Sequence, residues 1–329
     1  MKALITGGAG FIGQHLARQL LGRGYRIDIA DNFVRGARDE GVETLAASPG
    51  VRLLDADLLQ ADGLADAASD YDFIFHFAAI VGVANVLERP EAVLRDNVTM
   101  LVHALDRARS QTRLRRFVFP STSEIYAGTL EHFGLPLPTP ESTPLALPDL
   151  ARPRTSYMLS KLYGEALCHH AGVAFTILRP HNVYGPRMGL SHVVPELLER
   201  AHRAADGDVL EVFSIDHRRT FCYVDDAVTL FATAAETPAC EGETLNLGTD
   251  GPEITIGELA AIVVDVVGKP LEIVPGPETE GSAPRRRPDL VRAVELTGYR
   301  PKVSLRDGIE KTYAWYRANV FDRGGVYVR

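Results

Sequence analysis

The sequence predicts an α/β fold built on a doubly wound parallel sheet, followed by a smaller α/β lobe. Short β-rich runs alternate with segments whose apolar residues recur at helical spacing, from residue 1 to about 180. A glycine-rich turn follows the first of these runs, and an aspartate follows the second. This alternation indicates βαβ crossovers, and hence a Rossmann-type sheet with helices on both faces.

The runs that we expect to form strands are Ala3–Thr6, Arg26–Ala30, Val51–Leu54, Phe73–Phe77, Phe117–Pro120 and Phe175–Leu178. A stretch rich in Pro, Leu and Thr, Gly128–Pro153, predicts an ordered loop over the carboxyl edge of the sheet. After residue 180 the pattern is less regular. We expect residues 1–180 to form one domain, with returning segments around 215–250, and residues 181–329 to form a smaller, partly intertwined lobe.

Helix signals are clear in this second lobe. A capping box, Thr255–Glu258, precedes an amphipathic run. Pro288-Asp289 precedes the run LVRAVELTG, in which Gly298 is the expected C-terminal stop. Ser304 is expected to cap a last helix, Leu305–Arg317.

With 329 residues, 46% hydrophobic and 24% charged, the chain has the composition of an ordinary soluble globular protein. A formal net charge of -8 argues against nucleic acid as its main partner. The cysteines are too scattered for a disulfide framework or a metal site and favour a cytoplasmic protein with reduced thiols: Cys168, Cys222 and Cys240. The longest apolar helix candidate, Leu259–Val267, is short and contains Asp265, so no membrane span is expected.

The glycine pattern Gly7-x-x-Gly10-x-x-Gly13 lies in TGGAGFIG, between the first strand and a helix that starts near Phe11. Glycines permit a tight turn, close approach of the backbone to a pyrophosphate, and close packing of the helix on the sheet. The helix N-terminus adds free N–H groups and a partial positive charge. Taken alone, the pattern is also typical of a plain glycine-rich turn.

Asp31 follows the second strand run, RIDIA, where its carboxylate can accept hydrogen bonds from the hydroxyls of an adenosine ribose. The same carboxylate would repel a 2′-phosphate, which favours NAD over NADP. Arg35 lies nearby in the sequence and weakens this discrimination. The structural alternative for Asp31 is a turn residue at the end of a strand.

Tyr157 and Lys161 belong to the helical run SYMLSKLYGEAL. Positions i and i+4 share a helix face, so the phenol and the ammonium can point into one site. The lysine charge, and that of an oxidised nicotinamide, are expected to lower the pKa of the tyrosine and make it a base. Chance pairs of this kind are common on helix surfaces, but here the pair follows the glycine turn and Asp31.

A polar segment, STSEIY (Ser121–Tyr126), directly follows the strand RRFVFP, at the edge where open α/β sheets place their ligands. Thr122 is expected to hydrogen-bond the substrate oxygen that Tyr157 deprotonates. Ser123 and Glu124 are expected to serve a second proton transfer. A Ser/Thr-rich turn is the structural alternative for the serines, whereas a carboxylate there needs a partner or a chemical role.

These motifs resemble the extended short-chain dehydrogenase/reductase family, and most closely its NAD-dependent nucleotide-sugar epimerases, dehydratases and decarboxylases. The resemblance runs over most of the chain and rests on TGGAGFIG, Asp31-Asn32, Asp57-Leu58, HFAA (His76–Ala79), Asn97, STSEIY, YMLSK and RPHNVYGPR (Arg179–Arg187). It implies a Rossmann domain that holds NAD permanently and a second lobe that binds a nucleoside-diphosphate sugar, with a UDP-sugar favoured. It also implies a homodimer through the helices at Glu91–Ala108 and Ser156–His170.

The resemblance assigns roles by position, with Tyr157 as catalytic base and Thr122 as its partner. The residues that it places on NAD are Gly7, Gly10, Phe11, Ile12, Gly13, Asp31, Asn32, Asp57, Leu58, Phe77, Ala78, Ala79, Asn97, Tyr157, Lys161, Pro180 and Val183. Those that it places on the substrate are Thr122, Ser123, Asn182, Arg187, Arg219 and Arg286. Bidentate arginine suits a diphosphate or a sugar acid, although the run Arg285–Arg287 also has a surface alternative. His181 and His192 flank the expected sugar pocket without an assigned role.

The family chemistry begins with oxidation of the sugar at C4, in which Tyr157 takes the hydroxyl proton. Dehydratases usually carry Asp-Glu after the threonine, so Ser123-Glu124 disfavours dehydration. Thr-Ser-Glu and the segment Arg285–Pro288 match UDP-glucuronate decarboxylases, whereas the segment after YGPR does not. We therefore expect a 4-epimerase acting on a UDP-hexose or UDP-uronate, with UDP-glucuronate decarboxylation as the alternative. Asp31 opposes an NADP-dependent carbonyl reductase, and the presence of Tyr157 opposes a non-catalytic dinucleotide sensor.

Overall fold

The computed structural model describes residues 1–36, 38–279 and 281–323. Within them, seven strands form a parallel central sheet in the order β11-β6-β5-β4-β1-β2-β3. The strands are β1 (Lys2–Thr6), β2 (Arg26–Asp31), β3 (Val51–Asp55), β4 (Phe73–His76), β5 (Arg116–Pro120), β6 (Phe175–Pro180) and β11 (Glu243–Leu247). All the strands that the sequence predicts are present, and the doubly wound α/β class is confirmed.

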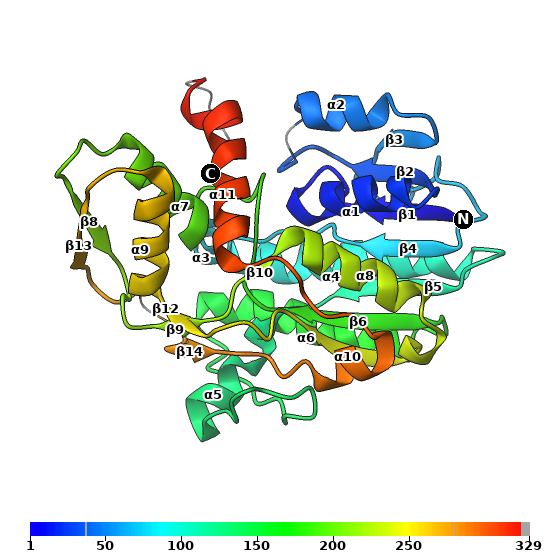
Figure 1. Ribbon diagram of the computed structural model, residues 1–329. Coiled ribbons are helices and arrows are strands. Elements are labelled where there is room, and N and C mark those ends of the chain that lie inside the picture. The colour runs from blue at the N-terminus through cyan, green and yellow to red at the C-terminus, as the bar shows by residue number, and fades with distance from the viewer. Residues whose placement is uncertain (37, 280, 324–329) are drawn as a thin grey trace.

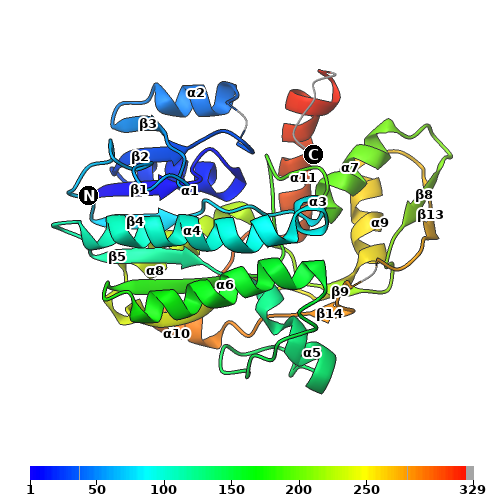
Figure 2. The same ribbon diagram turned by 180° about the vertical axis from the view of Figure 1, so that it is seen from behind.

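Helices cover both faces of this sheet. Figure 1 shows α1 and α8 in front of the sheet, and Figure 2 shows α4 and α6 side by side on the opposite face. The helices around the sheet, counting both faces, are α1 (Phe11–Gly22), α2 (Glu40–Ala46), α3 (Val83–Glu88), α4 (Pro90–Arg109), α6 (Pro153–His170), α8 (Val224–Glu236) and α10 (Val291–Thr297). Separate apolar clusters fill the two sides, with Leu16, Phe75 and Phe231 on one and Leu101, Phe117 and Ile177 on the other.

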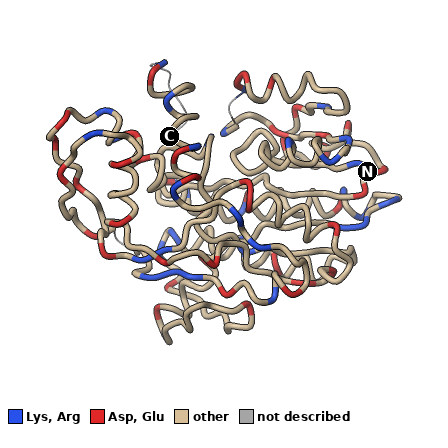
Figure 3. The backbone as a smooth tube through the Cα atoms, in the orientation of Figure 1, with Lys and Arg blue, Asp and Glu red and all other residues tan. Residues whose placement is uncertain are grey.

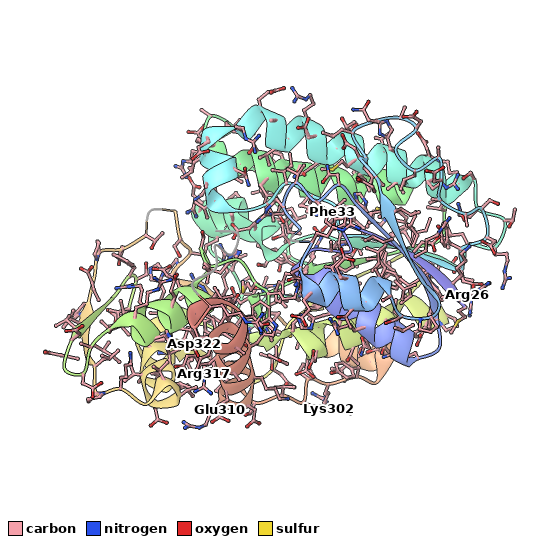
Figure 4. All side chains as sticks on the ribbon, turned by 90° about the horizontal axis from the view of Figure 1, so that it is seen from above. Arg26, Phe33, Lys302, Glu310, Arg317 and Asp322 are labelled. Carbon is pink, nitrogen blue, oxygen red and sulfur yellow. The ribbon has the colours of Figure 1, made fainter. Side chains whose placement is uncertain are left out.

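The second lobe packs beside the carboxyl ends of the strands (Figure 1). Its longer elements are α7 (Val193–Arg203), β8 (Val209–Val212), α9 (Ile256–Val267), β13 (Glu272–Pro275), α11 (Leu305–Tyr316) and η3 (Arg317–Phe321). Short strand pairs join it to the sheet domain: β7 (Val183–Tyr184) with β10 (Cys222–Tyr223), and β9 (Arg218–Arg219) with β12 (Ile254–Thr255) and β14 (Arg285–Arg286). Figure 4 looks down on α11, marked by Glu310, on η3, marked by Arg317, and on the loop after β2 that contains Phe33.

The predicted helix ends in this lobe are confirmed. Thr255 and Glu258 form the capping box, with the Glu258 N–H donating to Thr255 Oγ1 at 3.0 Å and the Thr255 N–H donating to the Glu258 carboxylate at 2.6 Å. Gly298 ends α10 in the left-handed conformation, at φ 68°. Ser304 caps α11 by accepting a hydrogen bond from the Asp307 N–H.

The expectation of a loop over Gly128–Pro153 is wrong for its first part, which forms α5 (Ala127–Phe133) directly after the 3₁₀ turn η1 (Ser123–Tyr126). Tertiary contacts hold this short helix. Thr129 Oγ1 donates to the Pro144 carbonyl at 2.6 Å and accepts from the Ala146 N–H at 2.9 Å. The returning chain therefore stabilises α5, which its local sequence does not signal.

One returning segment lies within the predicted range of 215–250 and another lies beyond it. β11 is within the range and completes the central sheet, whereas α10 is beyond it and packs against β11 and α8. A 3₁₀ turn, η2 (Pro238–Cys240), connects α8 to β11. Among the described helices, none has the length and apolar character needed to cross a membrane.

Candidate active site

The turn between β1 and α1 needs glycine at two of its positions. Gly7 has φ 67°, and a Cβ there would lie 2.6 Å from the Ala78 nitrogen. A Cβ on Gly13 would lie 2.5 Å from the Gly7 carbonyl oxygen. Gly10 is the N-cap of α1, and no described side chain caps the helix there. The first-turn N–H groups, starting at Phe11-Ile12, therefore point toward an open end that suits an anion.

Asp31 ends β2 beside this turn and is 8% exposed. Its carboxylate accepts hydrogen bonds from the Ala9 N–H at 3.0 Å and the Phe33 N–H at 2.9 Å. Burial raises the pKa of Asp31, although the two N–H donors partly offset this. The carboxylate is thereby locked at the end of β2, next to the glycine turn.

The residues predicted to surround adenosine lie together at the ends of β2 and β3. The Asn32 side-chain amide donates to Asp57 Oδ1 at 3.5 Å. Leu58, which follows Asp57, is buried, and its carbonyl lies 2.8 Å from His103 Nδ1.

The segment after β4 lies against the glycine turn on the side away from β2. We call the arrangement of the glycine turn, Asp31 and this segment the cofactor seat. Phe77 packs edge-on against Phe231 of α8, with ring centroids 4.9 Å apart, so its ring contributes to the core. Ala78-Ala79 follow, and the Ala78 backbone contacts the glycine turn. Asn97 of α4 exchanges hydrogen bonds of 2.6 and 3.1 Å with the Ile80 backbone, so it positions this segment. Because β1 pairs with β2 on one side and β4 on the other, the seat lies where the strand order reverses.

Tyr157 and Lys161 lie one turn apart on α6, as the spacing predicts. Lys161 Nζ lies 6.0 Å from the centroid of the Tyr157 ring and donates to the Pro120 carbonyl at 2.8 Å. Lys161 is 5% exposed, and burial lowers its pKa to about 8. The pKa of Tyr157 is raised, first by burial and then by Glu124, although Thr122 and Arg35 lower it. The expectation of a lowered tyrosine pKa is therefore wrong for the protein alone, because burial and Glu124 outweigh Thr122 and Arg35.

Thr122, Ser123 and Glu124 follow β5, and Thr122 caps η1 by accepting the Glu124 N–H at 3.2 Å. The Thr122 hydroxyl lies near enough to Tyr157 to lower the pKa of the phenol. Glu124 forms an ion pair with Arg286 at 2.5 Å. Burial opposes ionisation of Glu124, but Arg286, Arg154 and Arg219 outweigh it and hold the pKa of the carboxyl below its usual value.

The arginines around Glu124 come from separate elements. Arg219 on β9 and Arg286 on β14 are neighbours in the strand register, and Figure 3 shows the basic colour gathered on these two strands. The Arg219 guanidinium is buried and donates to the Ser282 hydroxyl at 3.1 Å. Burial, with Arg286 beside it, lowers the pKa of Arg219 to about 10. Arg154, in the first turn of α6, donates to the Gly281 carbonyl at 3.3 Å.

Two residues predicted to bind substrate have their side chains engaged elsewhere. Arg187, at φ 70°, pairs with Asp39 and donates to the Ala9 carbonyl at 3.2 Å, so it lies on the glycine-turn side. The Asn182 side-chain amide donates to the Thr220 carbonyl at 3.0 Å. Both sit between the sheet domain and the second lobe, close to Pro180 at the end of β6 and Val183 on β7.

Sequence reasoning missed two arginines of the site. Arg154 precedes Tyr157 by one helical turn, a spacing that could have served as a signal. For Arg35, the sequence indicates only proximity to Asp31. Its guanidinium lies 3.5 Å from the Cβ position of Gly82 and is close enough to lower the pKa of both Tyr157 and His192. No local pattern indicates that a loop after β2 reaches the tyrosine.

Together, the glycine turn at a helix N-terminus, the locked Asp31 and the half-buried Tyr157 beside the buried Lys161 define a dinucleotide-dependent enzyme of the Rossmann class. The family model of the NAD dependent epimerase/dehydratase family matches residues 3–248. The chain belongs to this family, and its cofactor is NAD.

Its relatives in the family catalyse different reactions. The chain is 31% identical over 330 residues to a UDP-N-acetyl-alpha-D-glucosaminuronate decarboxylase from Bacillus cytotoxicus, covering 96% of this chain and 98% of the relative. It is 30% identical to UDP-glucuronic acid decarboxylase 1 from Arabidopsis thaliana, covering 98% of this chain and 71% of the relative.

Among solved structures, it is similar to a UDP-glucose 4-epimerase from Thermotoga maritima with UDP-glucose. That match has 27% identity and a TM-score of 0.83, covering 97% of this chain and 100% of the other. A UDP-glucuronic acid 4-epimerase from Bacillus cereus, in complex with UDP-4-deoxy-4-fluoro-glucuronic acid and NAD, matches with 27% identity and a TM-score of 0.81. The match covers 97% of this chain and 99% of the other.

Proposed function

We propose that this protein decarboxylates a UDP-uronate through transient oxidation at C4. The observation that carries the proposal is the Glu124–Arg286 ion pair, with Arg154 and Arg219 near enough to lower the pKa of Glu124. These three arginines outnumber the carboxylates that act on them, Glu124 and, at Arg219, Glu253. Glu124 also raises the pKa of Tyr157. A partly buried site in which cations outnumber carboxylates favours an anionic sugar over a neutral one. The decarboxylase relatives support the same choice.

The residues divide into a cofactor seat and a reacting centre. Gly7, Gly10 and Gly13 let the turn pack directly against neighbouring backbone, so that its N–H groups and the N-terminus of α1 would hold a pyrophosphate, with Asp31 on a ribose. NAD, when bound, accepts hydride from C4 of the sugar and later returns it. Tyr157 takes the C4 hydroxyl proton, and Thr122 and Arg35 are the groups that favour its phenolate.

Loss of carbon dioxide then follows from the position of the ketone. A C4 carbonyl is β to the C6 carboxylate, so the C5–C6 bond breaks, CO₂ leaves and the electron pair moves to the C4 oxygen. Tyr157, now protonated, stabilises that oxygen through a hydrogen bond and keeps its proton. C5 takes a proton from solvent, relayed in this proposal by Ser123 and Glu124, which gives the 4-keto pentose. When hydride returns to C4, Tyr157 gives its proton to the C4 oxygen and the UDP-pentose is complete. Arg286 keeps Glu124 ionised and offers the substrate carboxylate a cation.

A 4-epimerase, which the sequence alone favours, is the second candidate. The solved epimerases with this fold support it. The Thr122–Tyr157–Lys161 set would serve epimerisation equally, provided that the 4-keto sugar turns over before C4 is reduced again.

The test uses the NAD-loaded full chain with UDP-glucuronate carrying a labelled carboxyl group, UDP-N-acetylglucosaminuronate, and UDP-glucose. We expect labelled CO₂ and a UDP-pentose or its 4-keto precursor, measured by gas trapping and chromatography. A 4-epimer without gas would overturn the decarboxylase proposal in favour of the epimerase. Replacement of Arg285, which pairs with Glu253 rather than with Glu124, is the matched control for replacement of Arg286.

We further propose a homodimer through α4 and α6. Both helices carry exposed apolar or aromatic side chains, Val102 on α4 and Tyr163 on α6. Light scattering should give twice the mass of the chain, and Tyr163→Glu should shift it toward the monomer. An unchanged dimer would place the interface elsewhere.

A further inference from the structure

His181 follows β6 and is held with one ring nitrogen against a fixed acceptor. Its Nε2 lies 3.3 Å from Oδ1 of Asn246, on β11. The Asn246 side-chain NH₂ donates to the Thr139 carbonyl at 2.9 Å and to the Asp289 carbonyl at 3.1 Å. These bonds assign the amide orientation and leave Oδ1 as acceptor only. His181 Nε2 therefore carries the proton and donates it to Asn246.

With Nε2 protonated, Nδ1 of His181 bears a lone pair. Among the described residues, nothing donates a hydrogen bond to this buried nitrogen, and the side chain as a whole is 2% exposed. Burial, together with Arg286 and Arg179, lowers the pKa of His181 to about 3, although Asn246 and Glu124 partly oppose this. The ring is therefore neutral, and Nδ1 is a permanent acceptor. Leaving a buried acceptor without a partner destabilises the protein, so a ligand is the natural partner to seek.

The surroundings of His181 belong to the substrate side of the site. A small cavity is lined by His181, Ser123, Tyr126 and Arg286. Ser123 precedes Glu124, and Arg286 is the ion-pair partner of Glu124. The ring therefore borders the reacting centre. The His181 backbone is held rigidly, because its N–H donates to the Leu247 carbonyl at 2.7 Å.

We infer that His181 is a specificity residue whose Nδ1 accepts a hydrogen bond from a hydroxyl or amide N–H of the sugar. The inference deepens the proposed function, since it rests on a UDP-sugar as substrate, but it applies equally to decarboxylation and epimerisation. A sugar without that donor leaves Nδ1 unpaired and is rejected for that reason.

The test compares two variants of the NAD-loaded full chain. In His181→Gln the amide can still donate to Asn246 but places no acceptor at the Nδ1 position. In His181→Asn the amide oxygen can occupy the Nδ1 position while the bond to Asn246 is lost. Calorimetry gives Kd for UDP, UDP-glucuronate, UDP-N-acetylglucosaminuronate and UDP-glucose. For the UDP-sugar that binds wild type most tightly, we expect the Gln variant to raise Kd about tenfold, with the Kd for UDP within about twofold.

The Asn variant should recover part of the lost affinity. A double-mutant cycle then combines the protein variants with two ligands that each lack one sugar hydroxyl, UDP-2-deoxyglucose and UDP-3-deoxyglucose. In wild type, one of these should bind about tenfold more weakly than UDP-glucose, and this difference should vanish in the Gln variant. If both variants fail to fold, the wild-type deoxy series alone decides.

An unchanged ratio of Kd for UDP to Kd for the UDP-sugar would overturn the inference and leave Nδ1 as the site of a buried water. The inference also fails if no UDP-sugar binds wild type more tightly than UDP, or if neither deoxy sugar is discriminated. If the affinities change as expected but no CO₂ is formed, the proposed function fails and the role of His181 stands.

Discussion

The two sides of the site are built differently. The cofactor side uses backbone geometry close to the start of the chain, where Gly7 and Gly13 exclude a Cβ and Asp31 is locked by N–H donors. The substrate side uses long charged side chains around Glu124, brought from α6, β9 and β14. The first can be recognised from local spacing, whereas the second exists only after distant segments have packed.

Tyr157 lies where the two sides meet, so its loss should have the largest effect. We expect Tyr157→Phe to lower kcat about a thousandfold, because the C4 hydroxyl proton then has no acceptor, while bound NAD stays near one per chain. Product chromatography and the absorbance of NAD released on denaturation check the two parts. Activity within tenfold of wild type would contradict the assigned base.

Arg286 tests the substrate side separately. Arg286→Met should lower kcat about a hundredfold without loss of NAD, whereas Arg285→Met should stay within about twofold. Without Arg286, Glu124 loses its ion-pair partner, and the pKa of that carboxyl rises from its lowered position. The acid limb of the kcat/KM profile should therefore move to higher pH. Equal effects of the two variants, or an unmoved limb, would remove Arg286 from the site.

Gly7 tests the cofactor side. Gly7→Ala places a Cβ 2.6 Å from the Ala78 nitrogen at φ 67°, so we expect loss of bound NAD and a destabilisation of about 2 kcal/mol. Gly22→Ala is the matched control, because no described atom lies within 4 Å of its Cβ position on α1. It should be neutral or stabilising. Retention of NAD by the Gly7 variant would show that the turn tolerates a side chain.

Replacement of His76, at the end of β4 beneath the cofactor seat, gives the smallest expected effect, and this effect is on the pH dependence of stability. Burial, with a smaller effect of Lys161, lowers the pKa of His76 from 6.5 to about 3. Below pH 6.5 the unfolded chain takes up a proton that the native state refuses, so stability falls as the pH falls from 6.5 toward 3. Between pH 7.5 and 5.5, wild type should lose about 1.4 kcal/mol more stability than His76→Phe. Urea unfolding at both pH values checks this, and equal losses would contradict a neutral native His76.

The predicted strands and caps agree with the structure because their signals are local. β11 was not predicted as a strand because its sequence, ETLNL, is short and partly polar. It is a strand in the structure because it pairs with β6. α5 was missed because the returning loop holds it through Thr129. Arg187 was assigned to substrate by position, yet its ion pair with Asp39 places it on the cofactor side.

The sequence by itself determined the fold class, the glycine turn with Asp31, and the Tyr157–Lys161 pair, because each depends on spacings within one strand–turn–helix unit or one helix. Tertiary structure alone decided which arginines surround Glu124 and which tautomer His181 adopts. Those features require side chains from distant segments to share one buried volume. Charge and hydrogen-bond partners there are set by packing, and the cost of leaving a buried polar group unpaired then determines what the site can bind.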